Sequence, residues 1–381
     1  MENILVLHVS YESDEDSEPL ALENAKRVVL GCFDGLGGSS MYKCRKIGSS
    51  EDFIPASHYA SRLYKDSIGD FLEGNSTLIS SDLITKQFES ALAEIPQLFE
   101  EKPTIIKSKL AKRFASTCAL LQLELYDDKC KATSYWSGDS RVYKLSPKDG
   151  LVQLSKDDIH GGLDPYQNRV GGQMERYLSA DDPIEITEFG FDESSDPALF
   201  FTCSDGCFDI FNTPMHFEHF LLSMLVSCSS IDMLKDKLHS YYSEYKADDV
   251  SLAMYFWGFT EYSDLEKAFK RRLKTFGKTY WQNLDIKEKV RNSFDEKYTE
   301  SKFGKGAFKN LTISNHIKNQ IKDLGFVLKE NVDIQTEMYN NFKEALVETV
   351  LNVSEPKSEE PTVKMDEVWS NYRVNYYKHF A

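Results

Sequence analysis

The sequence predicts an α+β fold in which β-sheets are covered on their outer faces by helices, followed by an all-α C-terminal region. Up to about residue 260, apolar runs rich in β-branched residues alternate with stretches of helical spacing, in the order strands, two helices, strands, helix, strand. Beyond Gly258 the sequence becomes rich in Lys and Glu with spaced aromatic residues. With 381 residues, 41% of them hydrophobic, the chain can bury the cores of one large domain and a smaller one.

Seven apolar runs predict strands, because each is short and is bounded by polar or glycine-containing sequence. They cover residues 3–10, 27–33, 117–125, 132–136, 141–145, 198–203 and 249–257. The spacing of large apolar residues predicts helices over residues 56–73 and 81–99, and within the tract 217–242. Strands and helices in this order favour an α+β sandwich over residues 1–260.

A helical extension is predicted over residues 261–381. A helix is expected to begin near Ser263, and further helical spacing covers residues 317–324 and 338–351. The stretch 353–363 contains two prolines and no apolar periodicity, which is typical of a linker.

Two features of this extension suggest contacts with another surface. The basic cluster at residues 270–272 fits either a solvated helix face or a contact with an acidic surface. The aromatic residues Trp369, Tyr372, Tyr376 and Tyr377 near the end of the chain are suited to docking. We therefore expect residues 261–381 to have a regulatory or assembly role, through self-association or binding of a partner.

The net charge of −16 is unevenly distributed along the chain. Residues 1–260 contain 24 Lys and Arg against 42 Asp and Glu, whereas residues 261–381 contain 21 against 19. An acidic balance argues against a nucleic-acid partner, because phosphate backbones are bound by clustered Lys and Arg. The acidic excess of the first part fits either a solvated surface or carboxylates that converge on a divalent cation.

The cysteines and the N-terminal residues bear on the cellular compartment. Seven cysteines occur without a repeated short spacing, which favours a reducing compartment over a disulfide framework or a zinc site. Residues 1–10 lack the pattern of a secretory signal, and no apolar stretch approaches the length of a membrane span. The sequence therefore predicts a cytoplasmic protein without a membrane partner.

Four segments place an aspartate at or next to the end of a predicted strand. These aspartates are Asp34, Asp139, Asp205 and Asp248, separated by 105, 66 and 43 residues. Glycines beside them permit tight turns, so that several strand ends can converge. Carboxylates that are packed together repel each other, and a pair of divalent cations would relieve the repulsion and activate a water for attack on phosphorus. Any one Asp-Gly pair taken alone is more often only a turn.

Together these segments resemble the motifs of the metal-dependent protein phosphatase family (PPM, or type 2C), bacterial type, over residues 3–258. The matching segments are Asp34-Gly35-Leu36-Gly37-Gly38, Gly138-Asp139-Ser140-Arg141, Ser204-Asp205-Gly206-Cys207-Phe208-Asp209 and Asp248-Asp249-Val250-Ser251. The resemblance implies a β-sandwich of two antiparallel sheets flanked by helices. It also implies a signalling hydrolase that removes phosphate from phosphoserine or phosphothreonine of a protein substrate, by means of a water that bridges two Mn²⁺ or Mg²⁺ ions.

The same resemblance implies a set of metal ligands. Carried over residue by residue, the groups that would hold the two ions are the side chains of Asp16, Asp34, Asp205 and Asp248 and the carbonyl of Gly35. Among them, Asp34 and Asp205 are expected to be essential for catalysis. Glu15 stands beside Asp16, where it can act through a water. A third, weaker ion found in some members would contact Asp139 and Asp209.

Two departures from the family pattern keep a second hypothesis open. Tyr11 stands where members usually have an arginine that grips the substrate phosphate. Asp249 replaces the usual asparagine, and its charge would either raise the pKa of Asp248 or strengthen metal binding. The alternative to an enzyme is a pseudophosphatase or interaction module that keeps the fold and binds a partner through residues 261–381.

Overall fold

The computed structural model describes most of the first three quarters of the chain and a short segment at its end. The described residues are 3–12, 14–37, 41–75, 77–103, 112–159, 174–211, 213–245, 248–277 and 372–380. The chain divides into two compact units, one made of Met1–Lys274 with Tyr372–Ala381 and the other of Thr275–Asn371.

The boundary predicted from the sequence and the boundaries of the two compact units lie at different residues. The predicted boundary near residue 260 separates a catalytic part from an extension, and it stays a prediction. By contacts, the first unit continues to Lys274 and includes the end of the chain. The predicted helices at 317–324 and 338–351 and the predicted linker at 353–363 lie outside the described residues.

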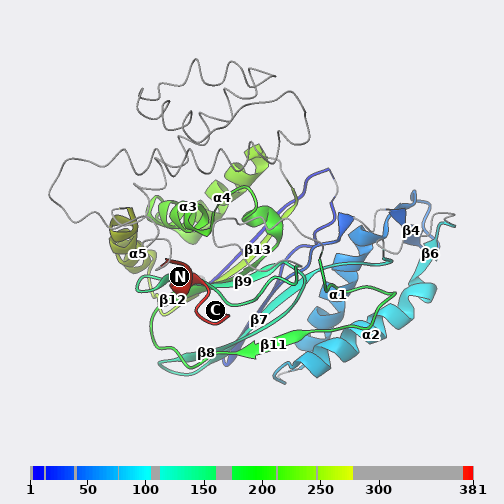
Figure 1. The fold of residues 1–381 in the computed structure, drawn as a ribbon, viewed down its shortest axis with the longest axis horizontal. Coiled ribbons are helices and arrows are strands. Elements are labelled where there is room, and N and C mark those ends of the chain that lie inside the picture. Colours follow the sequence, from blue (N-terminus) through cyan, green and yellow to red (C-terminus); the bar gives the residue numbers. More distant parts are fainter. Residues whose placement is uncertain are drawn as a thin grey trace, which may run out of the picture. The chain divides into compact units, whose positions relative to one another are not determined.

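Two five-stranded antiparallel sheets form the centre of the first unit (Figure 1). The first sheet consists, in spatial order, of β1 (Ile4–Val9), β13 (Val250–Trp257), β12 (Ala198–Cys203), β9 (Arg141–Ser146) and β10 (Gly150–Gln153). The second consists of β11 (Thr187–Gly190), β8 (Cys130–Ser137), β7 (Cys118–Leu125), β3 (Arg27–Cys32) and β2 (Leu20–Asn24). The predicted sandwich of two antiparallel sheets is confirmed.

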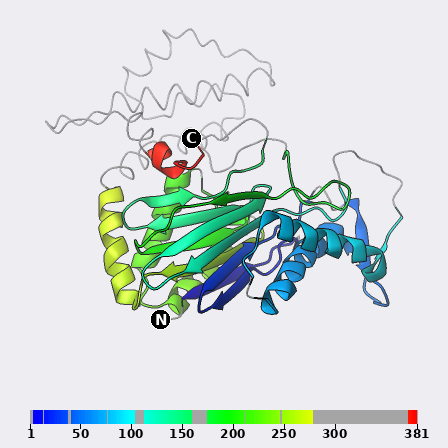
Figure 2. The ribbon, with the colours of Figure 1, turned by 90° about the horizontal axis from the view of Figure 1, so that it is seen from below.

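Helices cover the outer faces of this sandwich. The second sheet carries α1 (Ala56–Glu73) and α2 (Ser81–Leu98), whereas α3 (Pro214–Val226) and α4 (Ile231–Tyr245) pack on the first sheet. Figure 1 shows these two pairs of helices on opposite sides of the strands, and Figure 2 shows α5 (Tyr262–Phe276) away from α1 and α2. A small third sheet joins β5 (Ile54–Pro55), β4 (Lys43–Lys46) and β6 (Phe99–Glu101).

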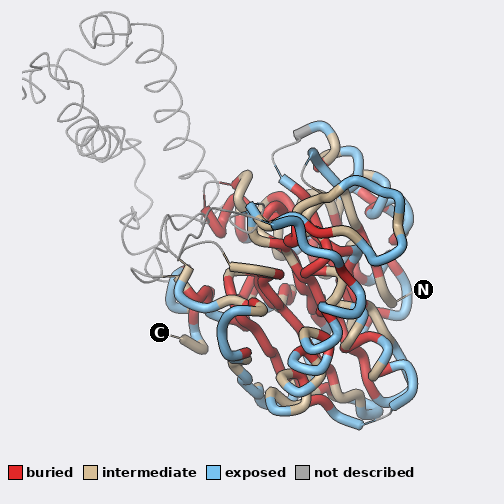
Figure 3. The backbone as a smooth tube through the Cα atoms, turned by 90° about the vertical axis from the view of Figure 1, so that its right-hand side faces the viewer, coloured by how far each residue is buried: buried red, intermediate tan, exposed pale blue. Residues whose placement is uncertain are grey.

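The central strands are apolar on both faces because each face is covered. Every residue of β3 and of β12 is buried, as is nearly all of β13. One core lies between the sheets and includes Val28, Leu121, Phe200 and Ala253. Figure 3 shows the buried backbone in red surrounded by exposed loops. Strands covered on both sides read as continuous apolar runs, which is why the sequence shows them clearly.

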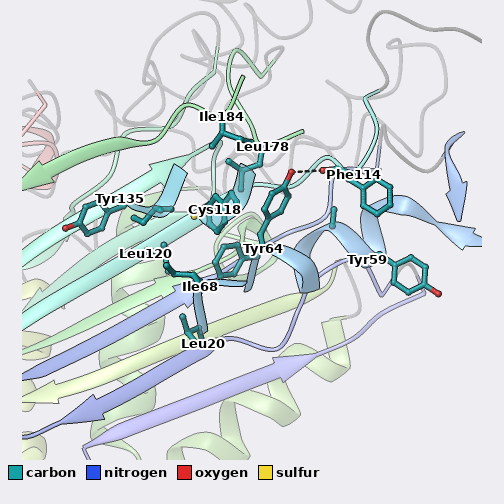
Figure 4. Close-up of a cluster of buried hydrophobic side chains, with 14 of the residues drawn as sticks. Leu20, Tyr59, Tyr64, Ile68, Phe114, Cys118, Leu120, Tyr135, Leu178 and Ile184 are labelled. Carbon is teal, nitrogen blue, oxygen red and sulfur yellow. Dashed lines mark hydrogen bonds between the residues drawn. The ribbon is translucent and has the colours of Figure 1, made fainter. Parts of the chain in front are cut away.

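A second core lies between the second sheet and helices α1 and α2 (Figure 4). Ile68 of α1 and Phe88 of α2 pack in it together with Leu120 of β7. The Tyr64 hydroxyl donates a hydrogen bond of 3.2 Å to the carbonyl oxygen of Phe114, so this polar atom has a partner in the apolar cluster. These contacts fix α1 beside the residues that lead into β7 of the second sheet.

The structure refines several sequence-based elements. The tract 217–242 forms two helices rather than one, because α3 ends at a C-cap on Ser227 and α4 begins at Ile231. The helix expected near Ser263 begins one residue earlier, at Tyr262. Short or partly exposed strands such as β2 and β11 have weak apolar patterns, and the sequence did not predict them. Within the described ranges, no helix has both the length and the apolar character needed to cross a bilayer.

Candidate functional site

In the first sheet, strand register brings three of the predicted aspartates to one end of the strands. Cys203, the last residue of β12, pairs with Leu252 near the start of β13. On its other side it pairs with Arg141, the first residue of β9. Asp205 follows β12, Asp248 precedes β13 and Asp139 precedes β9. These aspartates therefore lie beyond the same strand ends.

Asp34 reaches this end from the second sheet, where it follows β3. The amide of Thr117 donates a hydrogen bond of 2.7 Å to the carbonyl oxygen of Asp34. The Thr117 Oγ1 shares a hydrogen bond of 2.6 Å with the Oγ of Ser140, which is next to Asp139. One residue at the start of β7 thus ties the first aspartate turn to the second.

Two glycines allow the other turns to pack together closely. A Cβ atom on Gly35 would lie 2.4 Å from the carbonyl oxygen of Ser57 and 2.8 Å from that of Glu15. A Cβ atom on Gly206 would lie 2.0 Å from the carbonyl oxygen of Asp249. No side chain fits at such distances, so glycine is required where the first turn meets the loop before β2 and where the third turn meets the fourth.

Asp249 fixes the acidic loop that carries Glu15 and Asp16. Its carboxylate accepts hydrogen bonds from the amide of Glu15 at 2.6 Å, from that of Asp16 at 3.4 Å, and from that of Tyr11. Asp249 is buried, with 2% of its surface exposed. The aspartate in place of the family's asparagine therefore has a role that neither sequence-based alternative included, namely to cap backbone amides of this loop.

The side chains of the acidic loop are held by helix α1. The Ser57 Oγ donates a hydrogen bond of 2.7 Å to the Glu15 carboxylate, and Arg62 pairs with Asp14 at 3.0 Å. Tyr11, at the position where the family has an arginine, keeps 37% of its surface exposed. Arg62 thus supplies a positive charge at this loop, although it comes from a helix rather than from β1.

The aspartates act on one another electrostatically. Burial, and then the charges of Asp16 and Asp205, raise the pKa of Asp34 well above its usual range. Burial, and then the charges of Asp139 and Asp209, raise the pKa of Asp205 in the same way. Burial also raises the pKa of Asp16 to about 7 and that of Asp139 to about 7. Like charges from distant segments are therefore neighbours in a poorly solvated place.

Two carboxylate oxygens in this region are buried without a hydrogen-bond partner among the described residues, Oδ2 of Asp16 and Oδ1 of Asp139. Buried polar atoms normally have partners, and hard divalent cations take carboxylate oxygens as ligands. In charge and donor chemistry, the side chains therefore fit Mg²⁺ or Mn²⁺. Their arrangement is looser than a finished metal shell, because no three His, Cys, Asp or Glu side chains in the described ranges are gathered at metal-binding spacing.

The remaining predicted ligands, Asp248, Asp209 and Gly35, lie in the same region. Asp248 is exposed, and its charge acts on Asp16 and on Asp205. Asp209 lies one turn beyond Asp205, and its amide donates a hydrogen bond of 2.9 Å to the carbonyl oxygen of that residue. The carbonyl of Gly35 belongs to the turn that packs on the acidic loop. All seven predicted positions therefore belong to one end of the sandwich.

Sequence reasoning missed two aspartates that support the second motif. Asp157 pairs with the buried Arg141 at 2.6 Å, and Asp158 accepts a hydrogen bond of 3.1 Å from the amide of Gly138. The Asp158 amide donates in return to the carbonyl oxygen of Gly138 at 3.0 Å. The sequence does show Asp157 and Asp158 as an Asp-Asp pair shortly after β10, but it does not reveal which turn this pair contacts.

Comparisons with known proteins find similarity in solved structures only. No family model and no curated protein matches the chain. A serine/threonine phosphatase Stp1 from Staphylococcus aureus is 16% identical, with 68% of this chain and 96% of that chain covered and a TM-score of 0.47. The catalytic domain of the phosphatase PstP in complex with two manganese ions is 15% identical, with 66% of this chain and 96% of that chain covered and a TM-score of 0.43. RsbX in complex with magnesium is 16% identical, with 67% of this chain and 95% of that chain covered and a TM-score of 0.39. At these identities and TM-scores, the similarities establish neither family membership nor activity.

Proposed function

We propose that this protein hydrolyses phosphoserine or phosphothreonine on protein substrates with the help of two divalent cations, Mn²⁺ or Mg²⁺. The observation that carries the proposal is the meeting of carboxylates from five segments at one end of the sandwich. The motif resemblance supports the same reading. The residues that would hold the two ions are Asp16, Asp34, Gly35 through its carbonyl, Asp205 and Asp248, with Asp139 and Asp209 available to a third.

The bound cations would lower the pKa of a water and neutralise the phosphoryl oxygens. The chain's own contribution is to hold the carboxylates in place. Thr117 fixes the backbone of Asp34, and Asp249 fixes that of Asp16. A cation held by these carboxylates would offset the repulsion within the acidic group, so the site would favour an ion of high charge density that prefers oxygen ligands.

The test is a phosphatase assay on the purified full chain with a phosphothreonine peptide and Mn²⁺. We expect release of phosphate by the wild type that depends on Mn²⁺ and is lost on chelation. Asp34→Asn keeps the shape of the side chain but removes its charge, and we expect it to lower the rate by about 1000-fold or more, because metal-ion catalysis is worth several kcal/mol.

The matched control is Asp127→Asn, which makes the same chemical change at an exposed turn between β7 and β8. It should leave the rate unchanged. Equal rates in wild type and Asp34→Asn would refute the assignment. A wild type that neither releases phosphate nor changes its melting temperature with Mn²⁺ would favour a binding module over an enzyme.

A further inference from the structure

The last described segment of the chain, residues 372–380, packs into the first unit and is called the tail below. Tyr372, Tyr376 and Tyr377 are buried, with at most 4% of their surface exposed, whereas Val374 on the opposite face is 65% exposed. The tail belongs to the same compact unit as the sheets, and the red turn lies against the strands in Figures 1 and 2. One face of the tail is therefore part of the domain.

Both polar and aromatic contacts fasten the tail. Asn375 Nδ2 donates a hydrogen bond of 2.6 Å to the carbonyl oxygen of Asp149, in the turn between β9 and β10. The ring of Phe380 meets that of Trp136 edge to face at 5.8 Å, and the ring of His379 meets that of Phe191 at 4.7 Å. The tail thus contacts both sheets, because Trp136 belongs to β8 and Asp149 follows β9.

A chain of polar contacts leads from the tail into the core. The hydroxyl of Tyr376 shares a hydrogen bond of 3.0 Å with that of Tyr143 in β9. The same Tyr143 hydroxyl accepts a hydrogen bond of 3.1 Å from Arg141 Nη1. Arg141, with 2% of its surface exposed, donates through Nε and Nη2 to the Asp157 carboxylate at 2.6 to 3.1 Å.

This series of polar contacts ends at two of the turns that carry the predicted aspartates. Asp157 is followed by Asp158, whose backbone and side chain close the turn at Gly138, directly before Asp139. The guanidinium of Arg141 also lies 3.8 Å from the ring centroid of Phe208, which stands between Asp205 and Asp209 in the third motif. Arg141 is therefore the point at which the tail, the second motif and the third motif meet.

We propose that Tyr376 is a positioning residue of the acidic site, supplied by the far end of the chain and acting through Tyr143 and Arg141. A buried arginine needs all its donors aligned, and a buried hydroxyl that loses its partner costs free energy. With Tyr376 in place, the Tyr143 hydroxyl is held where it accepts from Arg141. Arg141 in turn holds Asp157, whose neighbour Asp158 closes the turn before Asp139. Arg141 also contacts Phe208, which lies in the turn of Asp205. The effect on catalysis rests on the proposed function. The structural coupling between Tyr376 and the turn before Asp139 can be tested without catalysis.

The test uses Tyr376→Phe in the full chain, which removes one hydroxyl and keeps the ring. Amide hydrogen exchange at Gly138 and Asp158 is the first measurement, because their amides close the turn beside Asp139. Loss of one net hydrogen bond should speed exchange there by about 3- to 10-fold. The Mn²⁺ concentration that gives half-maximal phosphate release should rise by about 10-fold, as is usual for residues that orient metal ligands.

Val374→Ala is the matched control, because it changes an exposed residue of the same turn. It should change neither measurement. Unchanged exchange at Gly138 and Asp158 in both Tyr376→Phe and Tyr376→Ala would overturn the inference. If the wild type releases phosphate and Tyr376→Phe has the same Mn²⁺ requirement, the inference fails and the proposed function stands. If exchange is faster but no variant responds to Mn²⁺, the positional coupling stands and the proposed function fails.

Discussion

Two buried ionic centres in this domain are built on opposite principles. Between α3 and α5, Arg272 donates through Nε and Nη2 to one carboxylate oxygen of Glu218, at 2.9 and 2.8 Å, and the amide of Leu151 donates to the other. At the end of the sandwich, Asp16 and Asp34 are instead placed near further carboxylates. Besides burial, the charge of Asp16 raises the pKa of Asp34, and the charges of Asp249 and Asp248 raise the pKa of Asp16. Among the residues that the structure describes, the charge of the first centre is balanced by an arginine, whereas the second centre gathers mainly carboxylates.

A structural charge and a functional charge differ in what neutralises them. A buried carboxylate paired with an arginine and an amide holds elements together, as Glu218 does for α3, α5 and β10. A buried group of carboxylates without enough positive charge weakens the fold, and its cost is met only when a cation from solution binds. Arg141 donates to Asp157 and Tyr143, and its charge lowers the pKa of Asp139, but burial raises that pKa by more. The two centres should therefore respond to mutation with opposite signs.

The largest effect on stability is expected at the balanced centre. Arg272→Ala leaves the Glu218 charge buried without its guanidinium, and it should lower the free energy of unfolding by about 3 to 5 kcal/mol. Urea unfolding of the full chain measures the change. The control is Lys270→Ala on the same helix, whose side chain is 69% exposed and pairs with Glu266 one turn away. That loss should stay below about 0.5 kcal/mol, and a similar loss in both variants would contradict the assignment of Arg272 as a structural partner.

A smaller effect of opposite sign is expected at the acidic centre. Asp205→Asn removes one of several repelling charges, so it should raise the free energy of unfolding of the metal-free protein by about 1 to 3 kcal/mol. Unfolding in the presence of a chelator measures this gain. With Mn²⁺ added, the order should reverse, because only the wild type gains the full free energy of ion binding.

Asp127→Asn is the control for this pair of measurements, since it removes an exposed charge. It should give the wild-type stability under both conditions. A loss of stability in metal-free Asp205→Asn would show that Asp205 holds the fold together, as Glu218 does, and the comparison between the two centres would collapse.

The features of the fold and of the site that could be predicted are those that depend on residues close together in the sequence. The central strands were predicted because coverage on both faces makes each of them a continuous apolar run, as in β3 and β12. Four aspartates, Asp34, Asp139, Asp205 and Asp248, were predicted as a set because each lies in a turn next to a predicted strand, whereas Asp16, Gly35 and Asp209 were added through the family resemblance. Neither prediction needed knowledge of which segments meet.

What the sequence did not reveal depends on contacts between distant segments. Tyr376 and Tyr143 are 233 residues apart, and Arg272 and Glu218 are 54 apart, with no local pattern that marks them as partners. The basic cluster at residues 270–272 illustrates the limit. Arg272 is directed into the domain and Lys270 into solvent, although the sequence presents them as one patch. Only the helix rotation, which tertiary packing sets, separates the two alternatives.

The smallest effect is expected at Asp249, which links the two kinds of centre because a buried charge there is matched by backbone amides. Asp249→Asn keeps the shape but turns one acceptor oxygen into a donor, which cannot accept from the amide of Tyr11. Relief of repulsion with Asp16 offsets part of that loss, so we expect a net cost of about 1 kcal/mol in urea unfolding. The Mn²⁺ requirement should change by no more than about 2-fold, because the remaining side-chain oxygen can still accept from the amides of Glu15 and Asp16 and so keep Asp16 in place. Glu12→Gln, an exposed neutralisation in the same loop, controls for charge alone. A shift in the Mn²⁺ requirement of 10-fold or more, about 1.4 kcal/mol, in Asp249→Asn but not in Glu12→Gln would show that the charge of Asp249 itself contributes to cation binding.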